Sequence, residues 1–168
     1  VYVGERISIS LLAMALANKG IDAISFTGSQ SGIITTTDHT EARIVEVRPA
    51  RVCRQLEEKK VVIVAGFQGV SISGEITTLG RGGTDTSAVA MGVALAANKV
   101  EFFKDVDGMY EADPKTNPAA KHYPLLGYDQ ALQIISKGAK ILQGRAVELA
   151  KKNYIPLHIL SFSEFFSS

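Results

Sequence analysis

The sequence predicts an α/β sandwich with a mainly parallel sheet. Segments with helical spacing alternate with short runs rich in β-branched residues along the chain, which is the order that βαβ units produce. The run 61–65 (V-V-I-V-A) is continuously apolar, as expected for a strand that is buried on both faces. Ligands of such sheets bind beyond the carboxyl ends of the strands, so we expect functional residues in those turns.

The expected helices each carry a recognisable signal. The first covers 7–18, with serines near its start and Gly20 just past its end. Pro49 suits a first helical turn and precedes the expected polar helix 51–59. Small residues on several faces of the expected helix 84–98 suit close packing against a sheet. Two further helices are expected at 128–136 and 139–152.

The expected strands are short and separated by turn residues. They cover 22–27, 42–47, 61–65, 100–103 and 157–161. Residues 70–77 predict a hairpin that turns at Ser73–Gly74. Three prolines fall within 104–127, so we expect this segment to be irregular.

Composition excludes several classes of function. The chain has 168 residues, of which 46% are hydrophobic and 21% charged, enough for one packed core. A formal net charge of +1 provides no electrostatic case for a nucleic-acid or membrane partner. Cys53 is the only cysteine, which excludes a disulfide framework and a Cys-rich zinc site. No apolar run approaches about 18 residues, and Glu5 interrupts any signal-peptide pattern. We therefore expect a soluble protein of a reducing, cytoplasmic compartment.

The segment 77–87 (T-T-L-G-R-G-G-T-D-T-S) has the strongest chemical signal. Its glycines let the backbone approach a ligand closely, and the helix that follows offers free N–H groups to an anion. Arg81 is suited to grip a carboxylate with two parallel hydrogen bonds. Asp85, four residues later, is suited to hold an ammonium group. These features predict a clamp for an amino acid, although a tight turn with a surface ion pair explains the same residues.

The segment 104–114 (K-D-V-D-G-M-Y-E-A-D-P) follows an expected strand. Its start resembles a calcium loop, but the later bidentate glutamate is absent, so we reject calcium. A nucleotide site fits better, because a turn at Gly108 leads to Tyr110, which is suited to pack on a base or ribose. The plain alternative is an Asp-rich turn.

Two weaker signals lie at opposite ends of the chain. Lys140, in G-A-K-I-L-Q-G-R at 138–145, is expected in the first turn of a helix, where its charge opposes the macrodipole. This placement suggests a bound anion such as phosphate, although a solvated lysine is the alternative. Glu5, in G-E-R at 4–6, is suited either to accept a substrate ammonium or to cap a helix. The three histidines lack metal-ligand spacing, and we expect each to be structural or solvated.

Together these segments resemble the aspartate kinases of the amino acid kinase family. The similar strings follow the family's order and cover nearly the whole chain. They are G-E-R at 4–6, G-S-Q-S-G-I at 28–33, A-G-F-Q-G at 65–69, T-T-L-G-R-G-G-T-D-T at 77–86, D-V-D-G-M-Y at 105–110, A-D-P at 112–114, G-A-K-I-L at 138–142 and I-P-L at 155–157.

The resemblance implies the three-layer α/β/α sandwich of that family and transfer of the ATP γ-phosphoryl group to the β-carboxylate of L-aspartate. The catalytic residues that it implies are Arg81 and Asp85. It implies an aspartate site at Glu5, Arg81, Gly82, Gly83, Thr84 and Asp85. It implies a nucleotide site at Lys104, Asp105, Tyr110, Lys115, Lys140 and Ile141, with Mg²⁺ bridging the phosphates. A homo-oligomer is also implied for the full-length protein.

Several positions depart from the family's pattern. Lys104 stands where the family usually has Thr or Ser, Lys115 replaces a common Arg, and Gln143 replaces a usual His. The family's opening K-F-G-G string and its C-terminal regulatory domains do not occur in these 168 residues. We therefore expect a partial catalytic domain over 1–168 that alone turns over little ATP. The alternative is a non-catalytic or degenerate ligand-binding module of the same fold.

Overall fold

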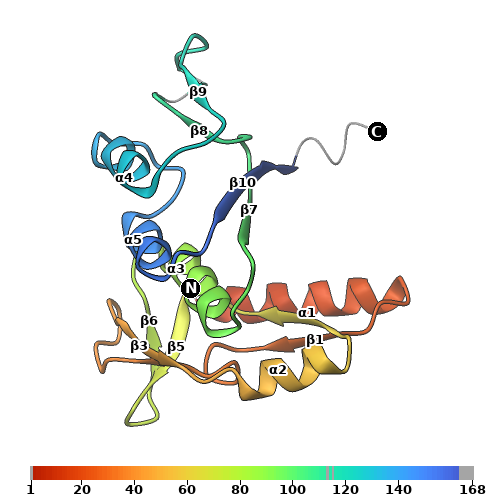
Figure 1. The fold of residues 1–168 in the computed structure, drawn as a ribbon. Helices are drawn as coiled ribbons and strands as arrows, with labels where there is room; N and C mark the ends of the chain where they lie inside the picture. The colour runs from red at the N-terminus through yellow and green to blue at the C-terminus, as the bar shows by residue number, and fades with distance from the viewer. Residues whose placement is uncertain (1, 113, 115, 163–168) are drawn as a thin grey trace. The chain divides into compact units, whose positions relative to one another are not determined.

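The computed structural model describes residues 2–112, 114 and 116–162, which form two compact units divided between Leu95 and Ala96 (Figure 1). The first unit contains α1 (Tyr2–Asn18), β1 (Ala23–Phe26), β2 (Ile33–Thr35), β3 (Ile44–Val47), α2 (Ala50–Glu57), β4 (Val61–Val64), β5 (Gln68–Ser71), β6 (Ile76–Thr78) and α3 (Gly83–Ala94). The second contains β7 (Val100–Lys104), β8 (Met109–Tyr110), β9 (His122–Tyr123), α4 (Tyr128–Ser136), α5 (Gly144–Asn153) and β10 (Leu157–Ser161).

Two sheets organise the first unit. Strands β1 and β4 pair in parallel, with Ala23 opposite Val61, and helices α1 and α2 pack on this pair. The second sheet has the strand order β3-β2-β5-β6, in which β2 and β5 are parallel and the outer pairings are antiparallel. Helix α3 packs on this sheet through contacts with β3 and β5. Ile33 and Val89 are fully buried between these elements.

Strand β5 approaches the chain that precedes β2 so closely that Gly28 has no room for a side chain. A Cβ atom placed there would overlap the backbone carbonyl of Gln68. The turn at 27–31 is closed by its own polar groups, because the Ser31 hydroxyl donates to the Gly28 carbonyl oxygen at 2.8 Å. Backbone contact of this kind is a reason for glycine at a fixed position.

The second unit is built on the parallel pair of β7 and β10, in which Val100 lies opposite Leu157 and Lys104 opposite Ser161. Helices α4 and α5 pack against each other. The Tyr128 hydroxyl donates to the Ile155 carbonyl oxygen at 2.8 Å, which ties the start of α4 to the end of the α5 segment. Strands β8 and β9 form a short antiparallel hairpin in which Tyr110 lies opposite His122.

The α/β class and the order of most elements are confirmed. Parallel pairing holds for β1–β4, β2–β5 and β7–β10, whereas hairpin neighbours pair antiparallel. The expected hairpin at 70–77 turns through Gly74, whose N–H donates to the Ser71 carbonyl oxygen at 2.9 Å. Within the described part of the chain, no helix is long and apolar enough to cross a membrane.

Several expectations were wrong in detail. The run 61–65 is not buried on both faces, since Val61 is 43% exposed and Val62 to Val64 are half-buried. Strand β2 was not expected. The segment 104–127 was expected to be irregular, but it contains the β8–β9 hairpin. Helix α5 begins at Gly144 rather than at 139, because the chain turns after α4 through Gly138, whose φ is 107°.

Candidate functional site

The glycine-rich turn between β6 and α3 lies in the first unit. Gly80 and Gly82 have φ values of 72° and 75°, in the left-handed region that favours glycine. These two residues reverse the chain within a few residues, so α3 begins at once after Gly82. Gly82 is the residue at the helix N-cap and supplies no side-chain cap.

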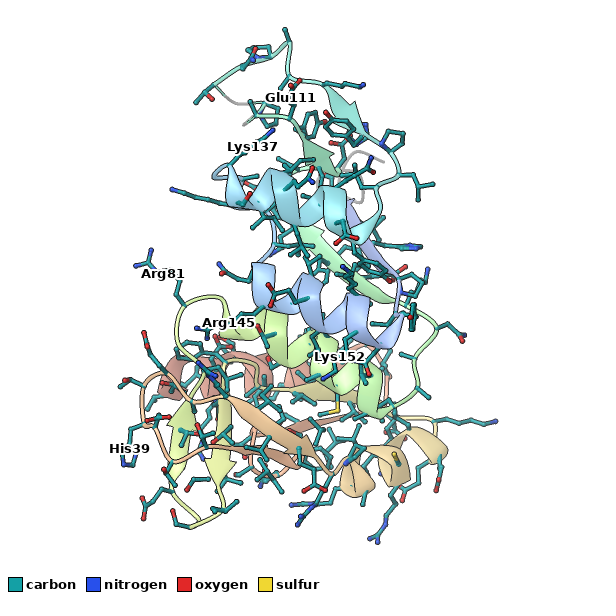
Figure 2. All side chains as sticks on the ribbon, turned by 60° about the vertical axis from the view of Figure 1, so that its left-hand side comes forward. His39, Arg81, Glu111, Lys137, Arg145 and Lys152 are labelled. Atoms are coloured by element: carbon teal, nitrogen blue, oxygen red, sulfur yellow. The ribbon has the colours of Figure 1, made fainter. Side chains whose placement is uncertain are left out.

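The turn displays the charged residues that the sequence predicted. Arg81 is exposed, and Figure 2 shows its side chain projecting away from the ribbon of the turn. Asp85 is half-buried in the first turn of α3, and Thr84 beside it is exposed. Glu5 is half-buried in the first turn of α1, in the same unit. A guanidinium and a carboxylate at one helix start can bind the two charged ends of an amino acid.

The start of α3 is fixed on the segment 65–69. The Ser87 hydroxyl accepts a hydrogen bond from the Phe67 N–H at 3.2 Å and donates one to the Thr84 carbonyl oxygen at 2.9 Å. A Cβ atom on Gly66 would lie 2.9 Å from Thr84 Cγ2, so the helix packs directly on this backbone. The segments 65–69 and 77–86, both of which resemble aspartate kinase strings, therefore contact each other directly.

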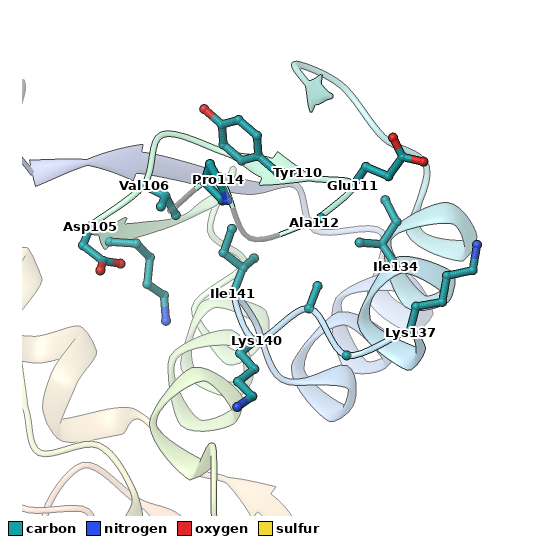
Figure 3. Close-up of a pocket in the computed structure, with 13 residues that line it drawn as sticks. Asp105, Val106, Tyr110, Glu111, Ala112, Pro114, Ile134, Lys137, Lys140 and Ile141 are labelled. Atoms are coloured by element: carbon teal, nitrogen blue, oxygen red, sulfur yellow. The ribbon is translucent and has the colours of Figure 1, made fainter. Parts of the chain in front are cut away.

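The second unit contains a pocket of about 520 Å³ (Figure 3). It brings together the two segments that the sequence predicted for a nucleotide, 104–114 and 138–145. Its lining residues are Lys104, Asp105, Val106, Tyr110, Glu111, Ala112, Pro114, Ile134, Lys137, Gly138, Ala139, Lys140 and Ile141. The volume lies within the usual range for small-molecule sites. Lys115 lies outside the described residues.

Charged and apolar groups share this pocket. Lys140 and Ile141 come from the turn before α5, and Ile134 comes from α4. Lys104 lies at the end of β7, with its Nζ 5.6 Å from the centre of the Phe102 ring. Lysines beside an apolar wall suit a ligand with phosphates and a flat ring.

The expected helical position of Lys140 was wrong. Helix α5 begins four residues later, so the charge of Lys140 does not oppose the dipole of the first turn. The inference of a bound anion from that opposition therefore fails. Lys140 remains a candidate nucleotide-binding residue because it lines the pocket.

The pocket contains residues that the sequence did not single out. Ile134 and Lys137 reach it because the end of α4 folds back on the loop after β7. Lys137 directly precedes the glycine of G-A-K-I-L, and this adjacency is the one signal that could have indicated it.

A small polar cluster borders the loop after β7. The Tyr110 hydroxyl donates a hydrogen bond to Asp107 Oδ1 at 2.6 Å. This bond lowers the pKa of Asp107 and raises the pKa of Tyr110. The Tyr110 and His122 rings lie with centres 4.8 Å apart and planes inclined by 40°. The sequence predicted a structural or solvated His122 because the histidines lack metal-ligand spacing, and its packing on Tyr110 is a structural role.

The described residues contain no cluster of three His, Cys, Asp or Glu side chains able to hold a metal ion. The described residues therefore provide no complete set of protein ligands for a metal ion. Mg²⁺ commonly binds through one or two carboxylates together with substrate phosphates and water. Asp105, in the pocket wall, is a suitable carboxylate for that arrangement.

The fold and these features define an α/β protein with a glycine-rich helix start in one unit and a lysine-containing pocket in the other. The model of the amino acid kinase family matches residues 1–161, and the chain belongs to this family.

Relatives in this family are similar over nearly the whole chain. An aspartokinase of Mycolicibacterium smegmatis is 48% identical over 159 residues, which are 94% of this chain and 38% of that protein. The structure of E. coli aspartokinase III in complex with aspartate and ADP has a TM-score of 0.87 and 30% identity, covering 94% of this chain and 36% of that one. Aspartate kinase from Synechocystis has a TM-score of 0.80 and 43% identity, with 96% and 26% covered. The chain thus spans about two fifths or less of the length of these relatives.

Proposed function

We propose that the protein is an aspartate kinase. A β-carboxylate oxygen of L-aspartate attacks the γ-phosphorus of ATP, the bond from that phosphorus to the β-phosphate bridging oxygen breaks, and 4-phospho-L-aspartate and ADP form. The observation that carries the proposal is the Arg81 turn at the start of α3, in a chain similar to aspartokinases. The substrate carboxylate is itself the nucleophile, so the enzyme has to position two anions and neutralise charge.

The proposed aspartate site lies at the start of α3 and at Glu5. The Arg81 guanidinium binds the α-carboxylate through two hydrogen bonds. Glu5 and Asp85 orient the α-amino group. Gly82, Gly83 and Thr84 provide backbone that a substrate can approach closely. Arg81 and Asp85 are the residues that we assign to catalysis, because they hold the reacting molecule.

The proposed nucleotide site is the pocket of the second unit. Lys104 and Lys140 neutralise phosphate oxygens, and Ile141 supplies apolar contact. Asp105 and Tyr110 complete this set, together with Lys115 from outside the described residues. Mg²⁺, when bound with the nucleotide, neutralises charge on the phosphates, and Asp105 is suited to hold it.

Three further proposals follow from this activity. The product places the protein at the first step toward lysine, threonine and methionine. ATP and free aspartate are metabolites of the cytoplasm, so we place the enzyme there. We expect the intact protein to be a homo-oligomer, as the family resemblance implies.

The test is the steady-state rate of aspartyl-hydroxamate formation by the intact protein that contains this chain. Arg81→Ala should raise the KM for aspartate at least tenfold, because a charged, two-point contact is lost. Arg54→Ala, which removes an exposed arginine of α2, is the matched control and should leave KM unchanged. An unaltered KM in the Arg81 variant contradicts the assigned aspartate site. A panel with glutamate, acetylglutamate and carbamate tests the substrate class.

A second candidate is a binding module without catalysis. The observation that favours it is Lys104, which places an extra cation in the pocket where the family usually has Thr or Ser. Such a module would bind ATP and aspartate in calorimetry but form no hydroxamate. Hydroxamate formation by the intact protein excludes it.

A further inference from the structure

A chain of side-chain contacts closes the loop between β7 and β8. Tyr110 donates its hydroxyl hydrogen bond back to Asp107, three residues earlier, at 2.6 Å. On strand β9, His122 lies opposite Tyr110 and packs its ring against the tyrosine ring at 4.8 Å between centres. Asp107, Tyr110 and His122 are called the latch below.

Gly108 makes room for the latch. A Cβ atom at this buried position would overlap the Nε2 end of the His122 ring. The imidazole therefore lies against bare backbone in the middle of the loop. His122 thus contacts the loop at two points, Gly108 and Tyr110.

The loop that the latch closes forms two sides of the pocket. Lys104, Asp105 and Val106 line it from the arm before the latch, and Tyr110 to Ala112 line it from the arm after. Asp107 and His122 do not line this pocket. Two of the three latch residues therefore lie outside the pocket, and the third, Tyr110, lies in its wall.

We propose that Asp107 and His122 are positioning residues, which act through Tyr110 to hold the two arms of this loop at the separation that a nucleoside phosphate requires. The proposal rests on the proposed nucleotide site. In this arrangement the Tyr110 hydroxyl donates its hydrogen bond to Asp107 and not to the bound nucleotide. Asp107 serves as acceptor for that hydroxyl, and His122 supports the ring from the other strand.

The latch explains the order of residues in this segment. An acceptor and a tyrosine three residues apart can close a turn, and a glycine between them admits the supporting ring. If the loop is not held, nucleotide binding has to order it, which costs affinity. The effect should appear in the Kd for the nucleotide and leave the aspartate site in the other unit unaltered.

The experiment measures binding of Mg²⁺–ADP to the intact protein that contains this chain, by calorimetry. Asp107→Ala and Tyr110→Phe should each raise the Kd about fivefold, which is the usual scale for one solvent-exposed hydrogen bond. The double variant should also be about fivefold weaker, because both changes break the same bond. Independent effects would multiply to about 25-fold.

Conservative variants separate positioning from loss of folding. Asp107→Asn keeps an acceptor oxygen and should restore most of the affinity that Asp107→Ala loses. His122→Phe keeps a ring and should bind better than His122→Ala. His158→Ala removes the exposed histidine of β10 and is the matched control, with an unchanged Kd. Urea midpoints measured alongside identify any variant that lost affinity by unfolding.

Each outcome decides something. If the unaltered intact protein binds Mg²⁺–ADP but its Asp107→Ala and His122→Ala variants bind equally well, the latch is refuted and the nucleotide site stands. If only the Tyr110 variants weaken binding, the hydroxyl contacts the ligand and the latch is again refuted. If the unaltered intact protein binds no nucleotide, the proposed site fails and the latch with it.

Discussion

Gly83→Ala tests how closely α3 is seated at the candidate aspartate site. Gly83 is the first residue of α3 and is buried. A Cβ atom there would lie 2.6 Å from Cβ of Leu79 and 3.0 Å from Cδ2 of Phe67. The nearer atom is attached directly to the backbone, so it cannot rotate away. The helix start has to move to admit the methyl group.

Two opposing effects determine how far Gly83→Ala changes the unfolding free energy. Overpacking a filled site costs about 1–3 kcal/mol, and replacing glycine by alanine in a helix returns about 1 kcal/mol. The balance of these two effects is a loss of about 0–2 kcal/mol of unfolding free energy. We expect a value in the upper half of this range, about 1–2 kcal/mol, because Leu79 is only 4% exposed and has little room to move. With a urea m-value of about 2 kcal/mol/M, the midpoint should fall by about 0.5–1 M.

The assay is urea unfolding followed by far-ultraviolet circular dichroism, with Gly4→Ala as the matched control. Gly4 lies in α1, and a Cβ atom there would meet nothing within 4 Å. This control should be stabilised by about 0.5–1 kcal/mol, since only the helix propensity changes. In the intact protein, Gly83→Ala should also raise the KM for aspartate, because Arg81 is carried on the turn that moves.

A Gly83→Ala variant as stable as the unaltered chain would refute this reasoning. It would mean that the turn before α3 relaxes freely. The tight seating of the helix could then no longer explain how Arg81 is positioned.

Three further predictions follow from single contacts. Arg81→Lys should weaken aspartate binding by about tenfold in calorimetry, because lysine keeps the charge and loses the planar fork. Ile33→Ala, at a fully buried site, should cost about 2–5 kcal/mol of unfolding free energy, whereas Ile72→Ala, where the side chain is 82% exposed, should change it by under about 0.5 kcal/mol in the same urea titration. The hydrogen bond from Tyr110 holds the pKa of Asp107 below its ordinary value of 3.8. The ionised Asp107 therefore stabilises the fold fully above that pH, and this contribution is lost as the pH falls through the lowered pKa. In urea titrations between about pH 6 and pH 2.5, Asp107→Asn should remove this part of the pH dependence of the unfolding free energy.

Local patterns predicted much of the fold. Helices α2 and α4 and strand β10 lie close to where periodicity, Pro49 and turn residues placed them, because these signals act between neighbours in the chain. The Arg81 turn could be identified for the same reason. Its glycines, its cation and the helix that follows are all contiguous in sequence.

Tertiary structure decided the features that depend on distant pairing. The β8–β9 register brings His122 to Tyr110, and the packing of α4 near the loop after β7 adds Ile134 and Lys137 to the pocket. The position of Lys140 was misjudged because Gly138 ends the preceding turn without starting a helix. A short apolar or polar segment is compatible with several partners, and only the register and packing of the folded chain select one of them.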